Sequence, residues 1–194
     1  MPVYLEDLRE GAEYRSAART ITERDITAFA ELSGDFSPLH TDDAWVRENT
    51  PFSGRIAHGA LVFAVSQGLR TPVVDDIAVI AFLEFERTLA GPVYPGDVIM
   101  ACWTVAEVRR SRSSRDRGVA RLRVEVVNQD GTVVQRGRDT YLAAARPLPG
   151  VEPAGGSPTV SPPAIGPPAV GPPAVGRPAV GVVSEATPRR AARP

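Results

Sequence analysis

A change of hydrophobic periodicity halfway along the chain constrains its fold most strongly. Residues 58–69 are apolar on nearly every side, which is typical of a helix buried in a core. After Pro72, β-branched and aromatic residues become frequent, and residues 119–127 alternate between apolar and charged side chains, as in a half-buried strand. One buried helix followed by a series of antiparallel strands predicts an α+β domain in which a sheet packs against that helix.

The strand region also contains its own turn signals. Residues 128–131, Asn-Gln-Asp-Gly, are typical of a tight hairpin turn, and the arginine-rich residues 109–118 predict a longer, charged hairpin loop. A sheet of such strands ends in unpaired edges, and edge-to-edge pairing of two copies would cover one of them, so we expect a homodimer. The expected strands are residues 77–87, 97–108, 119–127 and 132–145.

An earlier segment, residues 22–34, carries the signals of a helix start and a helix end. Thr22 followed three residues later by Asp25 is close to a capping box. Gly34 stands where a helix end favours a left-handed backbone. The expected helix therefore ends directly before Asp35.

Asp35 and His40 follow that helix on short, constrained backbone. Pro38 disfavours helical backbone at Ser37 and predicts an extended stretch that leads to His40. A second, short helix should begin just after His40 and end near residue 48. Such backbone would hold the carboxyl and the imidazole in a fixed relation, as a catalytic pair requires.

The last part of the chain has a different composition. Residues 147–194 are dominated by Pro, Gly, Ala and Val, and a pentapeptide related to Pro-Pro-Ala-Val-Gly recurs from residue 162 to residue 181. Proline at this density is incompatible with helices and with strand ladders. We expect residues 1–146 to form one domain and residues 147–194 to be a disordered tail.

The overall composition excludes several classes of protein. The net charge of −1 gives no field that would favour nucleic acid. No segment has the signature of a signal peptide or the length of a membrane span, so a cytoplasmic protein without a membrane partner is expected. Cys102 is the only cysteine, which excludes an intrachain disulfide and favours a buried structural thiol. One cysteine and two histidines are too few for a zinc site, and we expect neither a metal ion nor a cofactor.

The two histidines mark the candidate active site. His40 and His58 are the only histidines in the chain, and histidine changes its charge near pH 7 without help. Asp35 lies five residues before His40, and Gly59 follows His58 at the start of the apolar helix. A carboxylate beside an imidazole is typical of proton transfer, and a backbone N–H at a helix start favours developing negative charge. His58 taken alone more often shapes a loop or caps a helix.

These segments closely resemble the MaoC-like dehydratases, which include the (R)-specific enoyl-CoA hydratases. The resemblance covers about residues 20–145, and its most specific part is Asp-x-x-Pro-x-His at residues 35–40. It implies a hotdog fold, in which an antiparallel sheet wraps a long central helix, and usually a dimer. It implies reversible addition of water across the 2,3-double bond of an enoyl thioester of CoA or a carrier protein. The family's catalytic pair falls on Asp35 and His40, and its carbonyl-binding glycine falls on Gly59.

Two positions depart from the family pattern. Ser37 stands where the family usually has asparagine, so a hydrogen bond made by that asparagine must be remade or lost. The hydratases also tend to carry a serine on the central helix that supports the aspartate, and the equivalent position here is near Ser66 or Gln67. The expected substrate-binding residues are Ser37, His58, Gly59 and Ser66.

Two other functions remain open on the sequence. A hotdog thioesterase commonly carries its carboxylate on the central helix, but residues 59–69 contain neither Asp nor Glu. A non-catalytic acyl-thioester-binding protein would account for the departure at Ser37 and for the repeats of the tail.

Overall fold

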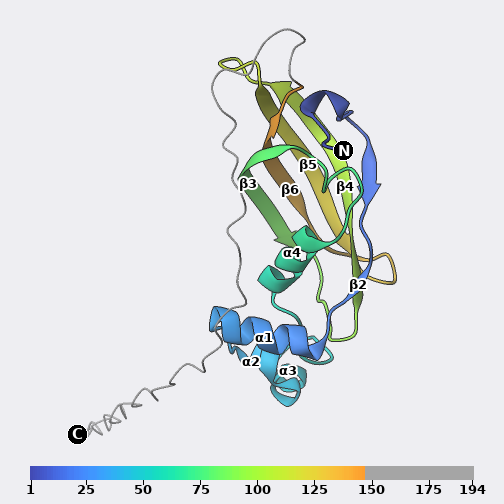
Figure 1. Cartoon of the computed structure of the whole chain (residues 1–194). Coiled ribbons are helices and arrows are strands. Elements are labelled where there is room, and N and C mark those ends of the chain that lie inside the picture. The colour runs from blue at the N-terminus through green and yellow to red at the C-terminus, as the bar shows by residue number, and fades with distance from the viewer. Residues whose placement is uncertain (147–194) are drawn as a thin grey trace, which may run out of the picture. The chain divides into compact units, whose positions relative to one another are not determined.

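The computed structural model of the chain describes residues 1–146, and the predicted disordered tail lies outside the described residues. Figure 1 shows a sheet with helix α4 lying against it and three further helices gathered at one end. The elements are a 3-10 helix η1 (Leu5–Asp7), β1 (Glu13–Arg15), β2 (Arg19–Thr20), α1 (Glu23–Ser33), α2 (Pro38–Thr41), α3 (Asp43–Asn49), α4 (Gly59–Gly68), β3 (Val79–Leu89), β4 (Val98–Arg110), β5 (Arg117–Val127) and β6 (Val133–Ala144).

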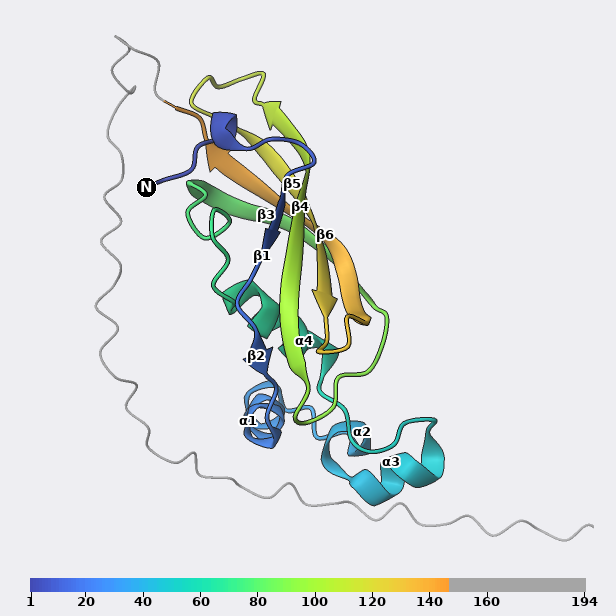
Figure 2. The ribbon, with the colours of Figure 1, turned by 90° about the vertical axis from the view of Figure 1, so that its right-hand side faces the viewer.

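The sheet is antiparallel, with the strand order β1-β4-β5-β6-β3 and with β2 paired to β4 as well. It twists strongly, and Figure 2 shows α4 beside the lower part of the sheet and α1, α2 and α3 below its end. This arrangement confirms the predicted α+β class with an antiparallel sheet against a central helix. It leaves β3 at one edge of the sheet, beside β6 only.

The core lies between α4 and the sheet. Leu61, Val62 and Val65 of α4 are buried, and they belong to one cluster with inward-facing residues of the sheet. The alternation predicted for β5 is present, because Leu122 and Val124 are almost completely buried. Burial of such side chains is the main stabilising contribution to a domain of this size.

The strands occupy the predicted segments with shifted ends. β3 begins at Val79 and ends at Leu89, two residues later than expected at each end. The charged hairpin loop is shorter than predicted, because β4 extends through Arg110 and β5 begins at Arg117. Although this segment is polar, the strand pairing continues into it, with Arg109 paired to Val119 and Arg110 to Gly118. The N-terminal strands β1 and β2 were not anticipated.

Helix α1 forms as its end signals predict. The Thr22 hydroxyl accepts the Asp25 N–H, and the Asp25 carboxylate accepts the Thr22 N–H, so the capping box is complete. Gly34 closes the helix with φ of 77° and ψ of 6°, and its N–H donates to the Ala30 carbonyl. This end fixes the point from which Asp35 departs.

The extended stretch predicted at Pro38 is wrong. Pro38 is the first residue of the short helix α2, and Ser37 caps it with an extended backbone and a hydroxyl that accepts the Leu39 N–H. Proline is well tolerated at a first helical position, since its missing N–H would have no intrahelical partner there. His40 is therefore carried on a helical turn, and α3 follows directly with Asp42 as its cap.

Two further predictions concern Cys102 and membrane-spanning helices. Cys102 lies in β4 as expected, but it is half-buried and not fully enclosed. Burial raises the pKa of its thiol above the usual value. Within residues 1–146, no helix combines the length and the apolar character that crossing a bilayer requires.

Candidate active site

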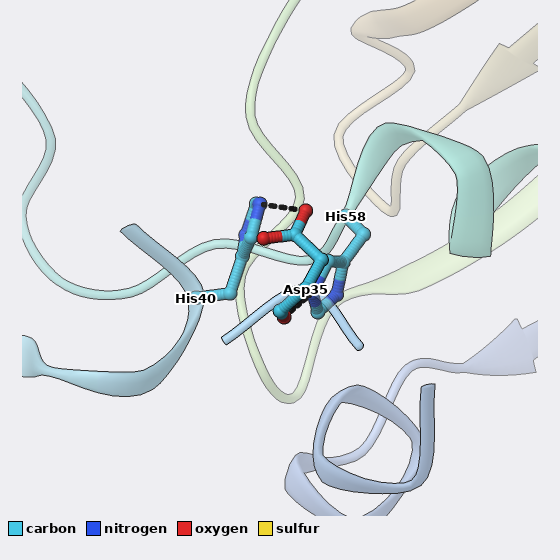
Figure 3. Close-up of side chains that lie close together, drawn as sticks. All are labelled: Asp35, His40 and His58. Atoms are coloured by element: carbon cyan, nitrogen blue, oxygen red, sulfur yellow. Dashed lines mark hydrogen bonds and ion pairs between the residues drawn. The ribbon is translucent and has the colours of Figure 1, made fainter. Parts of the chain in front are cut away.

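Asp35, His40 and His58 come together although three separate elements supply them. Asp35 follows α1, His40 lies in α2, and His58 is the residue before α4. Figure 3 shows the Asp35 carboxylate turned toward the His40 ring, with the His58 ring beside both residues. The structure therefore brings the predicted catalytic pair and the second histidine into one cluster.

The Asp35 carboxylate is held by the turn on which it lies. Its Oδ1 accepts the Ser37 N–H at 3.1 Å, which closes an Asx turn. The Asp35 N–H donates to the Ser33 hydroxyl at 3.2 Å. The side chain is 53% exposed, so Oδ2 is open to small molecules while Oδ1 fixes its direction.

The orientation of His40 is set by a residue sixteen positions away. Its Nδ1 lies 2.7 Å from the Ile56 carbonyl oxygen. A carbonyl only accepts, so Nδ1 carries the hydrogen and the neutral ring presents its lone pair at Nε2. The loop that supplies this carbonyl is itself fixed, because the Ile56 N–H donates to Leu39 and the Ala57 N–H donates to Val93.

The His40 lone pair and the Asp35 carboxylate face each other across a short gap. His40 Nε2 lies 3.9 Å from Asp35 Oδ2, which is longer than a direct hydrogen bond. One water molecule about 2.8 Å from each atom would span this distance. The pair is therefore suited to hold a water and to remove a proton from it.

His58 supports both members of this pair. Its Nε2 donates to the Asp35 backbone carbonyl at 3.0 Å, and its ring lies against the His40 ring with 3.8 Å between centroids. The His58 ring also lies near the Phe29 ring of α1, with 5.1 Å between their centroids. His58 is 3% exposed, and its Nδ1 is buried without a partner among residues 1–146. Its contacts position Asp35 and His40, which agrees with its interpretation as a histidine that shapes the loop.

Gly59 begins α4 directly beside the pair. The first N–H groups of a helix have no intrahelical acceptors, and the helix dipole favours negative charge at this end. A Cβ at position 59 would lie 2.7 Å from Leu89 Cδ1 and 2.8 Å from Leu89 Cδ2, so only glycine fits without displacing Leu89. The start of α4 thus offers an N–H that favours a negatively charged acceptor.

A cavity of about 490 Å³ lies beside this cluster, and Asp35 and His58 are not among its lining residues. His40 and Gly59 both line it, and most of the remaining wall is apolar, including Leu39, Val62 and Leu89. This size suits a small-molecule ligand. A larger hollow of about 900 Å³ lies on the other face of the sheet, where strands present charged side chains, but His40, Asp35 and Gly59 do not line it.

The two predicted serines have local roles in the structure. The Ser37 hydroxyl accepts the Leu39 N–H and so caps α2. Ser66 is completely buried, and its hydroxyl donates to the Phe63 carbonyl at 2.7 Å within α4. Neither serine lines the cavity of His40 and Gly59, nor does His58, and this geometry gives no support to the predicted binding of substrate by these three residues.

Asp35, His40 and His58 also form a group with potential metal-ligand atoms within 4.8 Å of one another. A zinc ion lies about 2.0–2.2 Å from nitrogen and oxygen ligands, and His40 Nε2 and Asp35 Oδ2 of this group are 3.9 Å apart. Each histidine also already uses one ring nitrogen to bind a backbone carbonyl. This donor set fits proton transfer better than ion binding.

Sequence reasoning missed a polar side chain of the cavity wall. Gln135 of β6 is 2% exposed, and its Nε2 donates to the Gly59 carbonyl at 2.7 Å. It also missed a buried ion pair between Arg87 and Asp139, which the Gln67 side chain joins from α4. A glutamine or an ion pair inside a strand region is not distinguished by sequence pattern from outward-facing polar residues.

Comparison with known proteins relates the chain to one family. The family model described as MaoC like domain matches residues 8–128. The (R)-specific enoyl-CoA hydratase of Rhodospirillum rubrum is 39% identical to the chain over 105 residues, which cover 53% of this chain and 69% of that protein.

Solved structures agree on the fold. The MaoC-like dehydratase from Rhodospirillum rubrum is similar with a TM-score of 0.65 and 30% identity, over 75% of this chain and 99% of that one. A Mycobacterium tuberculosis protein with a double hotdog fold has a TM-score of 0.64 and 21% identity, over 79% of this chain and 47% of that one. The predicted hotdog fold is confirmed by this likeness.

Proposed function

We propose, because this chain belongs to the MaoC-like domain family, that it is an enoyl-thioester hydratase and, in the reverse direction, a 3-hydroxyacyl-thioester dehydratase. The observation that carries the proposal is the pairing of the His40 Nε2 lone pair with Asp35 Oδ2 at 3.9 Å, beside a cavity that His40 and Gly59 line. The proposed substrate class is an acyl thioester of CoA or of an acyl carrier protein, and the Rhodospirillum rubrum relative is named as an (R)-specific enoyl-CoA hydratase.

In the hydration direction, Asp35 Oδ2 holds a water molecule and His40 Nε2 takes a proton from it. The water oxygen bonds to C3 of the enoyl group, and the π electrons move toward the thioester oxygen. The Gly59 N–H donates to that oxygen as its negative charge develops, and the loss of one such donor typically costs about 3–4 kcal/mol of transition-state stabilisation. The imidazolium of His40 then returns the proton to C2, which completes the addition of water and restores the neutral ring.

The activity test uses the full chain with crotonyl-CoA. Hydration removes the conjugated double bond, so the ultraviolet absorbance of the enoyl thioester falls with time. We expect turnover by the wild type and a loss of about 10²–10⁴-fold in His40→Ala, because general acid–base groups contribute factors of this size. Turnover that is equal in the two proteins would remove His40 from the mechanism.

The same reaction mixtures separate the two other functions. A thiol reagent detects free CoA, which a thioesterase releases and a hydratase does not. Release of thiol at the rate of absorbance loss would replace the proposal by thioester hydrolysis. Binding of crotonyl-CoA without any turnover, with affinity unchanged in His40→Ala, would indicate a non-catalytic acyl-binding protein.

We also propose that a second copy of the chain covers the free edge of β3. Six large apolar residues of β3 are exposed, among them Ile80, Phe82, Leu83 and Phe85. An unpaired strand edge with an apolar surface favours pairing with an identical edge, since a two-fold axis lets each backbone satisfy the other. Light scattering on the eluting protein should give twice the mass of the chain, and Phe85→Arg should shift the distribution toward the monomer. A monomeric wild type would contradict this proposal.

A further inference from the structure

Gly59 poses a conformational problem for the proposed chemistry. Glycine has the greatest backbone freedom of all residues, and fixing it costs the most conformational entropy. An N–H that stabilises an oxyanion must nevertheless be held in one direction before the reaction begins. A Cβ at this position would meet the end of the Leu89 side chain at 2.7 Å, and with glycine in place the restraint on this main chain comes from its neighbours.

Gln135 supplies such a restraint from the sheet. It lies near the start of β6, paired with Val126 of β5 on one side and with Leu89 of the edge strand β3 on the other. Its Nε2 donates to the Gly59 carbonyl at 2.7 Å. Because both neighbouring strands fix the Gln135 backbone, this bond ties the first residue of α4 to a rigid element.

The rest of the Gln135 side chain is poorly satisfied. The Gly59 carbonyl only accepts, so the amide must present its NH₂ group there and direct Oε1 elsewhere. Oε1 is buried and has no hydrogen-bond partner among residues 1–146. A buried amide oxygen without a donor destabilises a fold, and the surrounding cavity wall is mostly apolar. Fold stability alone would therefore favour an apolar residue at position 135.

We propose that Gln135 is a positioning residue of the active site, which holds the Gly59 main chain so that its N–H points at the thioester oxygen. Gly59 is then restrained from both sides, since His58 is anchored to the Asp35 carbonyl and Gln135 binds the carbonyl of Gly59 itself. The inference rests on the proposed role of Gly59, but the restraint can be measured without any activity.

The test compares Gln135→Leu and Gln135→Met with a matched control, Thr140→Val. Thr140 lies on the same strand, is 5% exposed, and has a hydroxyl without a partner within residues 1–146. It is five residues from Gln135 and so points to the opposite face of the sheet, away from Gly59. Thr140→Val thus also removes a buried unsatisfied polar atom but leaves the Gly59 restraint intact.

We expect both Gln135 variants to lower kcat for crotonyl-CoA about tenfold or more, with KM changed by less than about threefold, because an interaction needed in the transition state is lost. Their melting temperatures should stay at or above that of the wild type, and Thr140→Val should keep the wild-type kcat. The leucine and methionine variants differ in shape, so one of them remains informative if the other packs badly. A kcat within about twofold of the wild type in both Gln135 variants would overturn the proposal, as would equal losses of kcat and stability.

NMR relaxation provides the readout that is independent of turnover. The order parameter of the Gly59 N–H should be near 0.85 in the wild type and in Thr140→Val, and should fall toward about 0.6 in the Gln135 variants. If the wild type proves inactive on every acyl thioester, the proposed function fails while this measurement still decides the restraint. An unchanged Gly59 order parameter in both Gln135 variants refutes the positioning role in either case.

Discussion

The clearest test of the site is a pair of substitutions at Asp35 that separates its two hydrogen-bonding oxygens. Oδ1 closes the turn by accepting the Ser37 N–H, and Oδ2 faces His40 Nε2 at 3.9 Å. Asn keeps an acceptor for the turn but replaces the second oxygen by an NH₂ group, which donates where the carboxylate accepted. Ala removes both groups.

The two substitutions should differ in their effect on stability but not in their effect on activity. Asp35→Asn retains the turn bond, and the side chain is half exposed, so its stability should change by no more than about 0.5 kcal/mol. Asp35→Ala loses that bond at a cost of about 1 kcal/mol, which corresponds to roughly 3 °C in melting temperature for a domain of this size. Both variants should lose about 10²–10⁴-fold in kcat, because neither holds the water for His40.

Thermal unfolding followed by circular dichroism and crotonyl-CoA hydration measured on the same preparations provide the comparison. If Asp35 were only a turn residue, activity would follow stability, and the Asn variant would remain active. An Asn variant with more than about one tenth of the wild-type kcat would refute the assignment of Asp35 to the reaction.

Three further outcomes follow from the geometry. Gly59→Ala should slow hydration roughly tenfold or more, because its Cβ would meet Leu89 Cδ1 at 2.7 Å and displace a cavity-lining side chain; adding Leu89→Ala should restore much of the rate. The pKa of Asp25 is lowered below 3.8, and the largest cause is the hydrogen bond that the Thr22 N–H donates to the Asp25 carboxylate. Asp25→Ala should therefore cost about 1 kcal/mol at pH 7, and the difference from the wild type in urea titrations should disappear as the pH falls through the lowered folded-state pKa of Asp25. Cys102, whose pKa is raised by burial, should react with a disulfide reagent at pH 8 more slowly than free cysteine, and urea should remove the difference.

The sequence by itself determined the features that depend on neighbours within a turn or a strand. The capping box at Thr22 and the left-handed Gly34 formed where their signals lie, because their partners are only three or four residues away. The strand at residues 117–127 formed where alternation predicted it, since burial of one face decides which residues pair. Asp35, His40 and Gly59 could be singled out because their residue types and spacing resemble a known family.

Only the tertiary structure decided how these groups act together. The lone pair of His40 points at Asp35 because a carbonyl sixteen residues away binds its other nitrogen, and Gly59 is anchored by Gln135 from a strand 76 residues later. The type of a residue does not show which distant backbone atom will lie next to it in the folded protein. In the sequence, Gln135 looks like any other polar residue of a strand. Even Pro38 was read wrongly for this reason: its fixed φ suits an extended chain and a first helical turn equally, and the choice fell to the caps and contacts around it.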